Sequence, residues 1–581
     1  MENRNIMNKR LAYIVLVLAL GLAGCNFLDK NPDNRTEIDT KKKVRLLLVN
    51  AYDAPNYGPL CEFSSDNIID NNTPDSRGHV NTKQPFNQGF NQIFAWEDVT
   101  AFSSQDSPYA IWEHCYKNIA AANQALEAIK ALEEEGQNMN AEKAEALICR
   151  AYNHFILVNV FAQAYKSDEL STADMGIHYM TQAETEVKPE YERNSVTEVY
   201  RLIDQDIQEA LPMISDEYYA VPKYHFNVKA AYAFATRFYL FKRDYDKVIT
   251  YANKVLGTTP AEAAAVMFDA GTCKELGNLE LELYAWMDAS SPANLLIQST
   301  MSPALYSNLP DYCRYTFNRA PRDYTVNGSG PCWSSSFPGA NIWRYNANFG
   351  GFFSKIYALF EYTDKVAGIG FVRTLRREFT TGETLLCRAE AEIMKGQLSA
   401  AVTDMDVWAK GYLCTKDLTD SSIKSFFRKG KNVQQTPTLN NQKMCPSWKI
   451  SDAQMPYIWC VLHFRRIETL HDGMRWFDIK RYGIELTHEI GEKATKYRLI
   501  WNDDRRAIQL PQEAIIGGGQ TKNPRDIKGD NNSPMVSGGP DVEPNGLELF
   551  FKLKEEMRNL SITPENEVFK GEEDGELSDN L

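Results

Sequence analysis

Apolar side chains recur every three or four positions through several long segments of the chain, which is the period of an amphipathic α-helix. Residues 111–132 and 142–165 carry this pattern over their whole length and are separated by a short polar stretch. We expect these two segments to pack as an antiparallel helical hairpin. A first helix is predicted near residues 42–52, and Ser195 with Glu198 is placed as a capping box at the start of another.

Two further pairs of helical segments combine small residues with short connections, which is typical of tetratricopeptide-like pairs. One pair spans residues 227–241 and 244–257, and the other spans residues 383–395 and 399–410. Because a fixed repeat period is absent, we expect the pairs to be scattered through one scaffold instead of forming a regular array. The pattern as a whole predicts a mostly α protein.

Three stretches between the helical segments are rich in turn-forming residues, and the first two are also rich in aromatic residues. They cover residues 56–107, 286–351 and 517–545. Loops of this length in a compact protein usually carry function. We therefore expect the first two stretches to carry a binding site and the third to be a surface excursion near the C-terminus.

The N-terminal segment has the pattern of a lipoprotein export signal. Lys9 and Arg10 precede an apolar run over residues 11–20, and two small residues come directly before Cys25. The run is short for a spanning helix and typical of a cleaved signal. We predict a signal peptide over residues 1–24 and lipidation of the Cys25 thiol, with a secreted protein cleaved at the same small residues as the alternative.

Composition narrows the class of protein. The chain has 581 residues, of which 43% are hydrophobic and 24% charged, so it can bury a large core. Its formal net charge is −14 at pH 7. Because binding to phosphates requires a basic surface, nucleic acid is not an expected partner.

The remaining cysteines show no spacing typical of a zinc site. Several lie on apolar helix faces, where a buried free thiol is the simplest interpretation. Cys313 and Cys332 flank a loop-rich stretch and form the one candidate disulfide of an exported chain.

Motifs of catalysis are not found. His463 and His471 bracket Glu468, but the spacing is not that of H-E-x-x-H, and packed or exposed histidines are the better interpretation. A nucleophile elbow, a P-loop and a dinucleotide-binding fingerprint are also missing. We predict no catalytic residue, no metal ion and no cofactor.

Several segments carry a recognisable pattern of residues. They are Trp112, Tyr116, Ile119 and Asn123 in the first long helix, Arg150-Ala151-Tyr152, the segment 386–395 with its Arg-Ala-Glu-Ala sequence, and the segment 464–483 with its Asp-Gly turn and Arg-Trp-Phe-Asp sequence. In these segments the chain resembles the SusD/RagB family of cell-surface lipoproteins, and the last segment is the most diagnostic. The resemblance covers essentially the whole mature chain.

The resemblance implies a mostly α SusD-like fold, with tetratricopeptide-like pairs as scaffold and long loop-rich insertions carrying the ligand site. It implies one domain over residues 25–581, with an N-terminal part at 25–260 and a C-terminal part at 261–581. The implied protein is lipid-anchored in the outer membrane and faces the exterior. It would bind an oligosaccharide without cleaving it and deliver it to a SusC-like TonB-dependent transporter. A peptide-capturing RagB-like member and a surface glycosidase are the alternatives.

Sugars pack their C–H faces on aromatic rings and form hydrogen bonds with short polar side chains at the rim. The two loop-rich stretches provide such side chains, and the predicted ligand-binding residues are Trp96, Trp286, Trp343, Trp333, Tyr312, Tyr57, Asp66 and Asn91. The alternative for each ring is that it anchors its own loop to the helical core.

For the charged residues of segment 464–483 we predict a structural role instead of ligand binding. Arg465, Arg475 and Asp478 alternate with aromatic residues at helical spacing. Such a pattern is typical of a buried network of ion pairs and stacked rings that holds two helices at a turn. We expect these residues to stabilise the fold and not to contact a ligand.

Overall fold

The computed structural model describes residues 38–526, apart from internal segments at 54–55, 76–77, 79, 81–86, 101–104, 184–190, 306–307, 310–311, 340–341 and 347–348. The predicted signal peptide and Cys25 lie outside the described residues. The third loop-rich stretch lies outside them from residue 527 on.

Helices make up most of the regular structure. They are α2 (Lys41–Leu48), α3 (Gly58–Phe63), α4 (Gln88–Phe94), α5 (Pro108–Glu134), α6 (Asn140–Phe161), α7 (Val196–Ala210), α8 (Val228–Lys242), α9 (Tyr245–Leu256), α10 (Pro260–Ala264), α11 (Ala270–Glu275), α12 (Leu279–Trp286), α13 (Arg319–Asp323), α14 (Thr381–Met394), α15 (Leu398–Gly411), α16 (Asp420–Phe426), α17 (Asn441–Met444), α18 (Met455–Glu468) and α19 (Met474–Tyr482). The predicted helical hairpin and both predicted helix pairs are present, as α5–α6, α8–α9 and α14–α15. The mostly α fold class is confirmed.

The helix starts follow the capping residues of the sequence. The Ser195 hydroxyl accepts a hydrogen bond from the Glu198 N–H at 3.2 Å and begins α7. The other half of the predicted capping box is wrong, because the Glu198 carboxylate pairs with Arg201 at 2.8 Å instead. Gly257 ends α9 at a φ of 79°, which favours glycine. In the part of the chain that the structure describes, no helix has both the length and the apolar character needed to cross a membrane.

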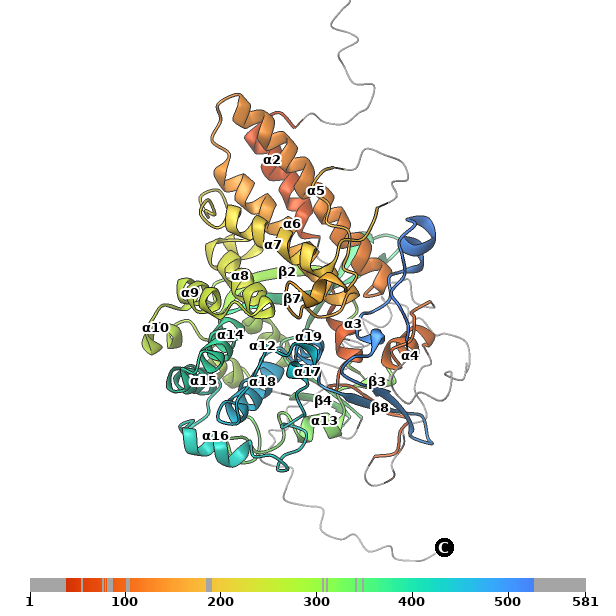
Figure 1. The fold of residues 1–581 in the computed structure, drawn as a ribbon, viewed down its shortest axis with the longest axis vertical. Helices are drawn as coiled ribbons and strands as arrows, with labels where there is room; N and C mark the ends of the chain where they lie inside the picture. Colours follow the sequence, from red (N-terminus) through yellow and green to blue (C-terminus); the bar gives the residue numbers. More distant parts are fainter. Residues whose placement is uncertain are drawn as a thin grey trace, which may run out of the picture.

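Strands are short and few. They are β1 (Ile69–Asp70), β2 (Asn294–Met301), β3 (Tyr315–Thr316), β4 (Ile342–Asn346), β5 (Gly350–Phe353), β6 (Tyr357–Asp364), β7 (Ile369–Thr380), β8 (Leu486–Ile490) and β9 (Thr495–Leu499). The largest sheet has the order β2-β7-β6 and is antiparallel, with Ile297 opposite Arg377. In Figure 1, α5 to α9, α14 and α15 follow one side of the molecule, while α3, α4, β3 and β8 lie on the other.

The second loop-rich stretch is therefore more regular than the sequence predicts, since β2, β3 and β4 lie within it. Strand β2 buries side chains on both faces, so it lacks the alternation of apolar and polar residues that reveals a half-buried strand. Strand β1 of the first stretch pairs with β3 of the second. The two stretches therefore lie together, although more than 200 residues separate Asp70 from its partner Tyr315.

Buried ion pairs hold α14, α18 and α19 together. Asp478 accepts from Arg465 at 3.0 Å and from Arg481 at 2.6 Å. Arg481 also pairs with Glu390 of α14 at 2.8 Å, and all four side chains are buried. This is the structural network that the alternating charges of segment 464–483 predict.

Buried hydrogen bonds also join the two loop-rich stretches near α5. The Asn56 amide donates to the Ser302 hydroxyl at 2.7 Å, and that hydroxyl donates to the Asp106 carboxyl at 2.8 Å. Burial raises the pKa of Asp106 to about 8, because a charged carboxylate would lose its water there. The Asp106 carboxyl therefore keeps its proton at neutral pH in the folded chain.

The cysteines beyond Cys25 are buried free thiols. This confirms the simplest interpretation for those on helix faces, such as Cys115 and Cys149. The predicted disulfide between Cys313 and Cys332 is wrong, because these two thiols are not bonded to each other and the thiol next to Cys332 is that of Cys414. The Cys313 backbone N–H donates to the Leu309 carbonyl at 2.9 Å.

Replacing Arg481 with Met is expected to lower the free energy of unfolding by about 3–5 kcal/mol, because Asp478 and Glu390 would keep buried charge without a full partner. The matched change Arg201→Met removes a pair whose arginine side chain is 56% exposed. It should cost less than about 1 kcal/mol. Urea unfolding of both variants makes the comparison, and equal losses would contradict a buried network.

Replacing Asp106 with Asn is expected to change the pH dependence of stability. The folded carboxyl has a pKa of about 8, above its unfolded value, so its contribution is complete below the unfolded pKa and is lost as pH rises. Between pH 5 and 7 wild type should therefore lose roughly 1–3 kcal/mol relative to Asp106→Asn. Urea unfolding at both pH values measures this, with the exposed Asp452→Asn as control, and parallel curves would refute it.

Candidate functional site

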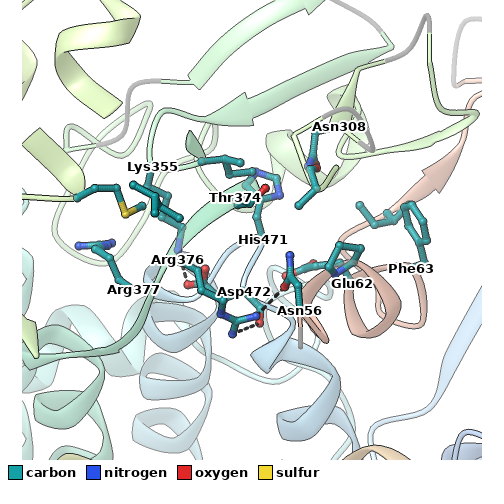
Figure 2. Close-up of a pocket in the computed structure, with 16 residues that line it drawn as sticks. Asn56, Glu62, Phe63, Asn308, Lys355, Thr374, Arg376, Arg377, His471 and Asp472 are labelled. Carbon is teal, nitrogen blue, oxygen red and sulfur yellow. Dashed lines mark hydrogen bonds and ion pairs between the residues drawn. The ribbon is translucent and has the colours of Figure 1, made fainter. Parts of the chain in front are cut away.

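A small polar cavity lies where the two loop-rich stretches meet β7 and the turn between α18 and α19. Its volume is about 30 Å³. The residues that line it are Asn56, Pro59, Glu62, Phe63, Ile68, Met287, Ala304, Asn308, Lys355, Ile356, Thr374, Leu375, Arg376, Arg377, His471 and Asp472. Figure 2 shows these side chains converging from α3, β7 and the loop after β5.

Two of the cations that line the cavity, Lys355 and Arg376, are paired with carboxylates. Lys355 Nζ lies 2.6 Å from Asp472 Oδ2 and donates to the Glu468 carbonyl oxygen at 2.9 Å. Arg376 Nη2 lies 2.9 Å from Glu378, and Arg376 Nη1 donates to Asn56 Oδ1 at 2.7 Å (Figure 2). Lys355 and Arg376 are therefore neutralised by their carboxylate partners and add little surplus charge to the cavity.

Burial shifts the titration of the other groups toward their neutral forms. It raises the pKa of Glu62 to about 7, and the Asn67 amide and the Gly473 N–H both donate to this carboxyl. It lowers the pKa of His471 to about 3, so this ring is neutral and accepts from the Phe353 N–H at 3.2 Å. No cluster of three or more His, Cys, Asp or Glu side chains in the described part of the chain could hold a metal ion.

The size of the cavity limits what it can do. A volume of about 30 Å³ has room for about two water molecules. Ligand pockets for small molecules are roughly ten times larger or more. The cavity therefore suits ordered water between ion pairs, and an oligosaccharide would have to bind on an outer surface of the loops.

The tryptophans predicted to bind a ligand are held inside the protein. Trp96 is 5% exposed, donates from Nε1 to the Ser64 carbonyl at 3.0 Å and stacks on His488. Its φ of 56° is unusual for a residue other than glycine, and these contacts hold it there. Trp286 is 1% exposed and donates to the Ser354 hydroxyl at 3.1 Å.

Trp333 and Tyr57 are similarly enclosed. Trp333 donates to the Gly328 carbonyl at 2.9 Å, within its own loop, and packs on Phe464. The Tyr57 hydroxyl donates to Glu378 at 2.8 Å. These contacts fit rings that anchor their loops, and no face of either ring is open to a ligand in this conformation.

The predicted polar contacts also have interior partners. Asp66 pairs with Arg475 at 2.8 Å and with Arg466 at 3.4 Å. Despite burial, these two arginines hold the pKa of Asp66 well below its usual range. Asn91 is buried and accepts from the Tyr315 hydroxyl.

Tyr312 and Trp343 are placed differently from the other predicted residues. Tyr312 is half-buried and packs at the edge of a small apolar cluster that includes Leu305 and Leu309. Trp343 lies on β4, opposite Phe352 of β5, and its side chain is outside the described part of the chain. A role of the eight predicted residues in ligand binding stays a prediction.

Two arginines that line the cavity pack on aromatic rings predicted to bind a ligand, and the sequence analysis missed both arginines. Arg376 lies 4.2 Å from the ring centroid of Tyr57, and Arg377 lies 4.3 Å from that of Trp286. The available signal was two adjacent arginines inside the β-prone run 371–380. Charges in such a run require buried partners when the strand lies in a core.

Residues 26–240 match the model of the SusD-like family described as "Starch-binding associating with outer membrane". No curated protein is similar enough in sequence to match the chain. The fold is similar to solved structures. A SusD superfamily protein from Bacteroides thetaiotaomicron VPI-5482 has a TM-score of 0.55 at 15% identity, over 83% of this chain and 99% of that one.

Two structures from Bacteroides vulgatus ATCC 8482 are similar to the same degree. A SusD superfamily protein has a TM-score of 0.54 at 17% identity, over 83% of this chain and 98% of that one. A SusD-like carbohydrate binding protein has a TM-score of 0.53 at 13% identity, over 82% and 96%. Residues 26–240 therefore match the SusD-like family, and the chain shares the fold of SusD superfamily structures over most of its length.

Proposed function

We propose that this chain is a cell-surface lipoprotein that captures an oligosaccharide and passes it to a SusC-like TonB-dependent transporter of the outer membrane. The observation that carries the proposal is the match of residues 26–240 to a family described by starch binding and association with the outer membrane. The carbohydrate binding protein from Bacteroides vulgatus supports the same class of ligand. The signal pattern that ends in Cys25 supports attachment through a lipid.

The ligand binds on the outer surface of the loop-rich side and is not cleaved. The one polar cavity described above is too small for a sugar ring, and the rings of Trp96 and Trp286 are enclosed. The β4–β5 hairpin of the second loop-rich stretch carries Trp343, the remaining predicted tryptophan for which no anchoring contact is described. We therefore place the sugar-stacking platform at this hairpin.

The transporter docks on the helical side of the molecule in this proposal. The pairs α8–α9 and α14–α15 form a continuous scaffold, because α9 packs against α14. Their outer positions carry charged side chains, such as the exposed pair of Lys395 with Asp246. A polar helical surface of this kind suits contact with another protein while the loop-rich side holds the ligand.

Replacing Trp343 with Ala is expected to weaken binding of the recognised oligosaccharide by about tenfold, because one stacking ring is lost. Unfolding stability should change little. Titration calorimetry against panels of neutral glycans and peptides identifies the ligand first and then measures the variant.

Trp96→Ala is the matched control. It should lower the free energy of unfolding by about 3–5 kcal/mol, because it empties a buried site, while the affinity of the folded fraction stays unchanged. If the chain binds only peptides of these panels, its ligand is a peptide and the proposed oligosaccharide ligand is wrong. New reducing ends after long incubation with the bound glycan would contradict a binding protein without catalysis.

Replacing Cys25 with Ser is expected to abolish acylation, because the thiol is the group that receives the lipid. Labelling of growing cells with radioactive palmitate should mark the wild-type chain and leave the variant unlabelled. Since an acyl-bearing anchor holds a protein at a membrane, the variant should also leave the membrane fraction. An unlabelled wild-type chain would refute the lipid anchor.

A further inference from the structure

Two buried thiols from distant parts of the chain meet beside the C-terminal end of α15. Cys332 lies in the loop after α13, and Cys414 follows α15. They are 1% and 4% exposed, respectively. The Cys414 thiol is the neighbouring group that acts most strongly on the Cys332 thiol, and Cys460 of α18 is a third thiol nearby.

Contacts of residues that lie near the two cysteines along the chain show independently that the same two segments are adjacent. Two residues beyond each cysteine, Lys416 Nζ donates to the Ser334 hydroxyl at 2.8 Å. The ring centroids of Phe337 and Tyr412 lie 5.4 Å apart. The loop after α13 therefore lies along the end of α15, with one of the two cysteines on each side of this contact.

We propose that Cys332 and Cys414 form a disulfide in the exported protein, which cross-links the second loop-rich stretch to the α14–α15 pair. The inference rests on the export part of the proposed function, because thiols stay reduced in the cytoplasm. Each thiol gives up one proton and one electron, and one S–S bond forms. The electron pair reduces the disulfide of an oxidised dithiol carrier to two thiols through a mixed disulfide.

The surroundings determine when the bond forms. The Cys414 thiol and burial hold the pKa of Cys332 well above its usual range, so the folded thiol is protonated and reacts slowly. A carrier protein also cannot reach a side chain that is 1% exposed. Oxidation therefore takes place during folding, before the loop closes over α15.

The cross-link gives the loop-rich stretch a covalent attachment to the scaffold. The loop it closes contains β4 to β7 as well as α14 and α15. Closing a loop of this length removes many conformations from the unfolded chain and so stabilises the folded one. It also holds Trp333 on Phe464, since Trp333 adjoins Cys332.

The direct test is peptide mapping of the full chain. The reduced, unfolded chain is refolded in a mixture of reduced and oxidised glutathione, free thiols are alkylated, and the digest is analysed by mass spectrometry. A peptide pair linked through Cys332 and Cys414 is expected, with Cys460 alkylated. Alkylation of both Cys332 and Cys414, or a link from either to Cys460, would overturn the proposal. Because refolding requires no export, this outcome is independent of lipidation at Cys25.

A second measurement uses the double variant Cys332→Ser/Cys414→Ser, which leaves no single thiol to pair with Cys460. Reduction with dithiothreitol should lower the midpoint of thermal unfolding of the oxidised wild-type chain by several degrees and leave that of the double variant unchanged. The control Cys115→Ser/Cys149→Ser removes two other buried thiols and should keep the wild-type shift. If reduction lowers the unfolding midpoint of the Cys332/Cys414 variant as much as that of wild type, the cross-link is refuted. If this variant does not fold, peptide mapping of the wild-type chain decides.

Discussion

Each charge that is buried between α14, α18 and α19 must have a partner, and this requirement holds the C-terminal half of the molecule together. Asp478 is shared by Arg465 and Arg481, and Arg481 reaches Glu390 on the third helix. A buried ion without a partner costs several kcal/mol. A displacement of any one of these helices would therefore leave a buried charge without a partner. Ion pairing thus fixes the relative positions of the three helices more strictly than apolar packing alone would.

The same requirement extends from the helices to the loops. Arg475 of α19 pairs with Asp66 at 2.8 Å, and Lys355 pairs with Asp472 at 2.6 Å. Between these pairs, Gly473 has a φ of 81°, and a Cβ there would lie 3.0 Å from Gly58 Cα. The turn after α18 thus packs directly against the first loop-rich stretch. The segment 464–483 is therefore the segment that joins scaffold and loops.

The helices could be predicted because their apolar period is local, and the limits of α5, α8 and α14 lie within a few residues of the expected ones. The placement of the loop residues could not. Asp66 looks like a ligand contact in the sequence, yet its partner Arg475 is 409 residues away. A sequence shows that a loop contains rings and carboxylates, but whether they point inward depends on partners that only the fold brings close.

The buried aromatic rings can still affect ligand binding, because they determine how rigid the loops are. Trp96 and Trp286 each use the indole N–H and a stacked neighbouring ring to fix a loop on the core. A loop that is already fixed loses little conformational entropy when a ligand arrives, which leaves more of the contact energy for affinity. The anchors can stay the same while the exposed side chains between them change. In such an architecture the specificity for a particular glycan would reside in those exposed positions, and the buried aromatic residues would set how rigidly they are presented.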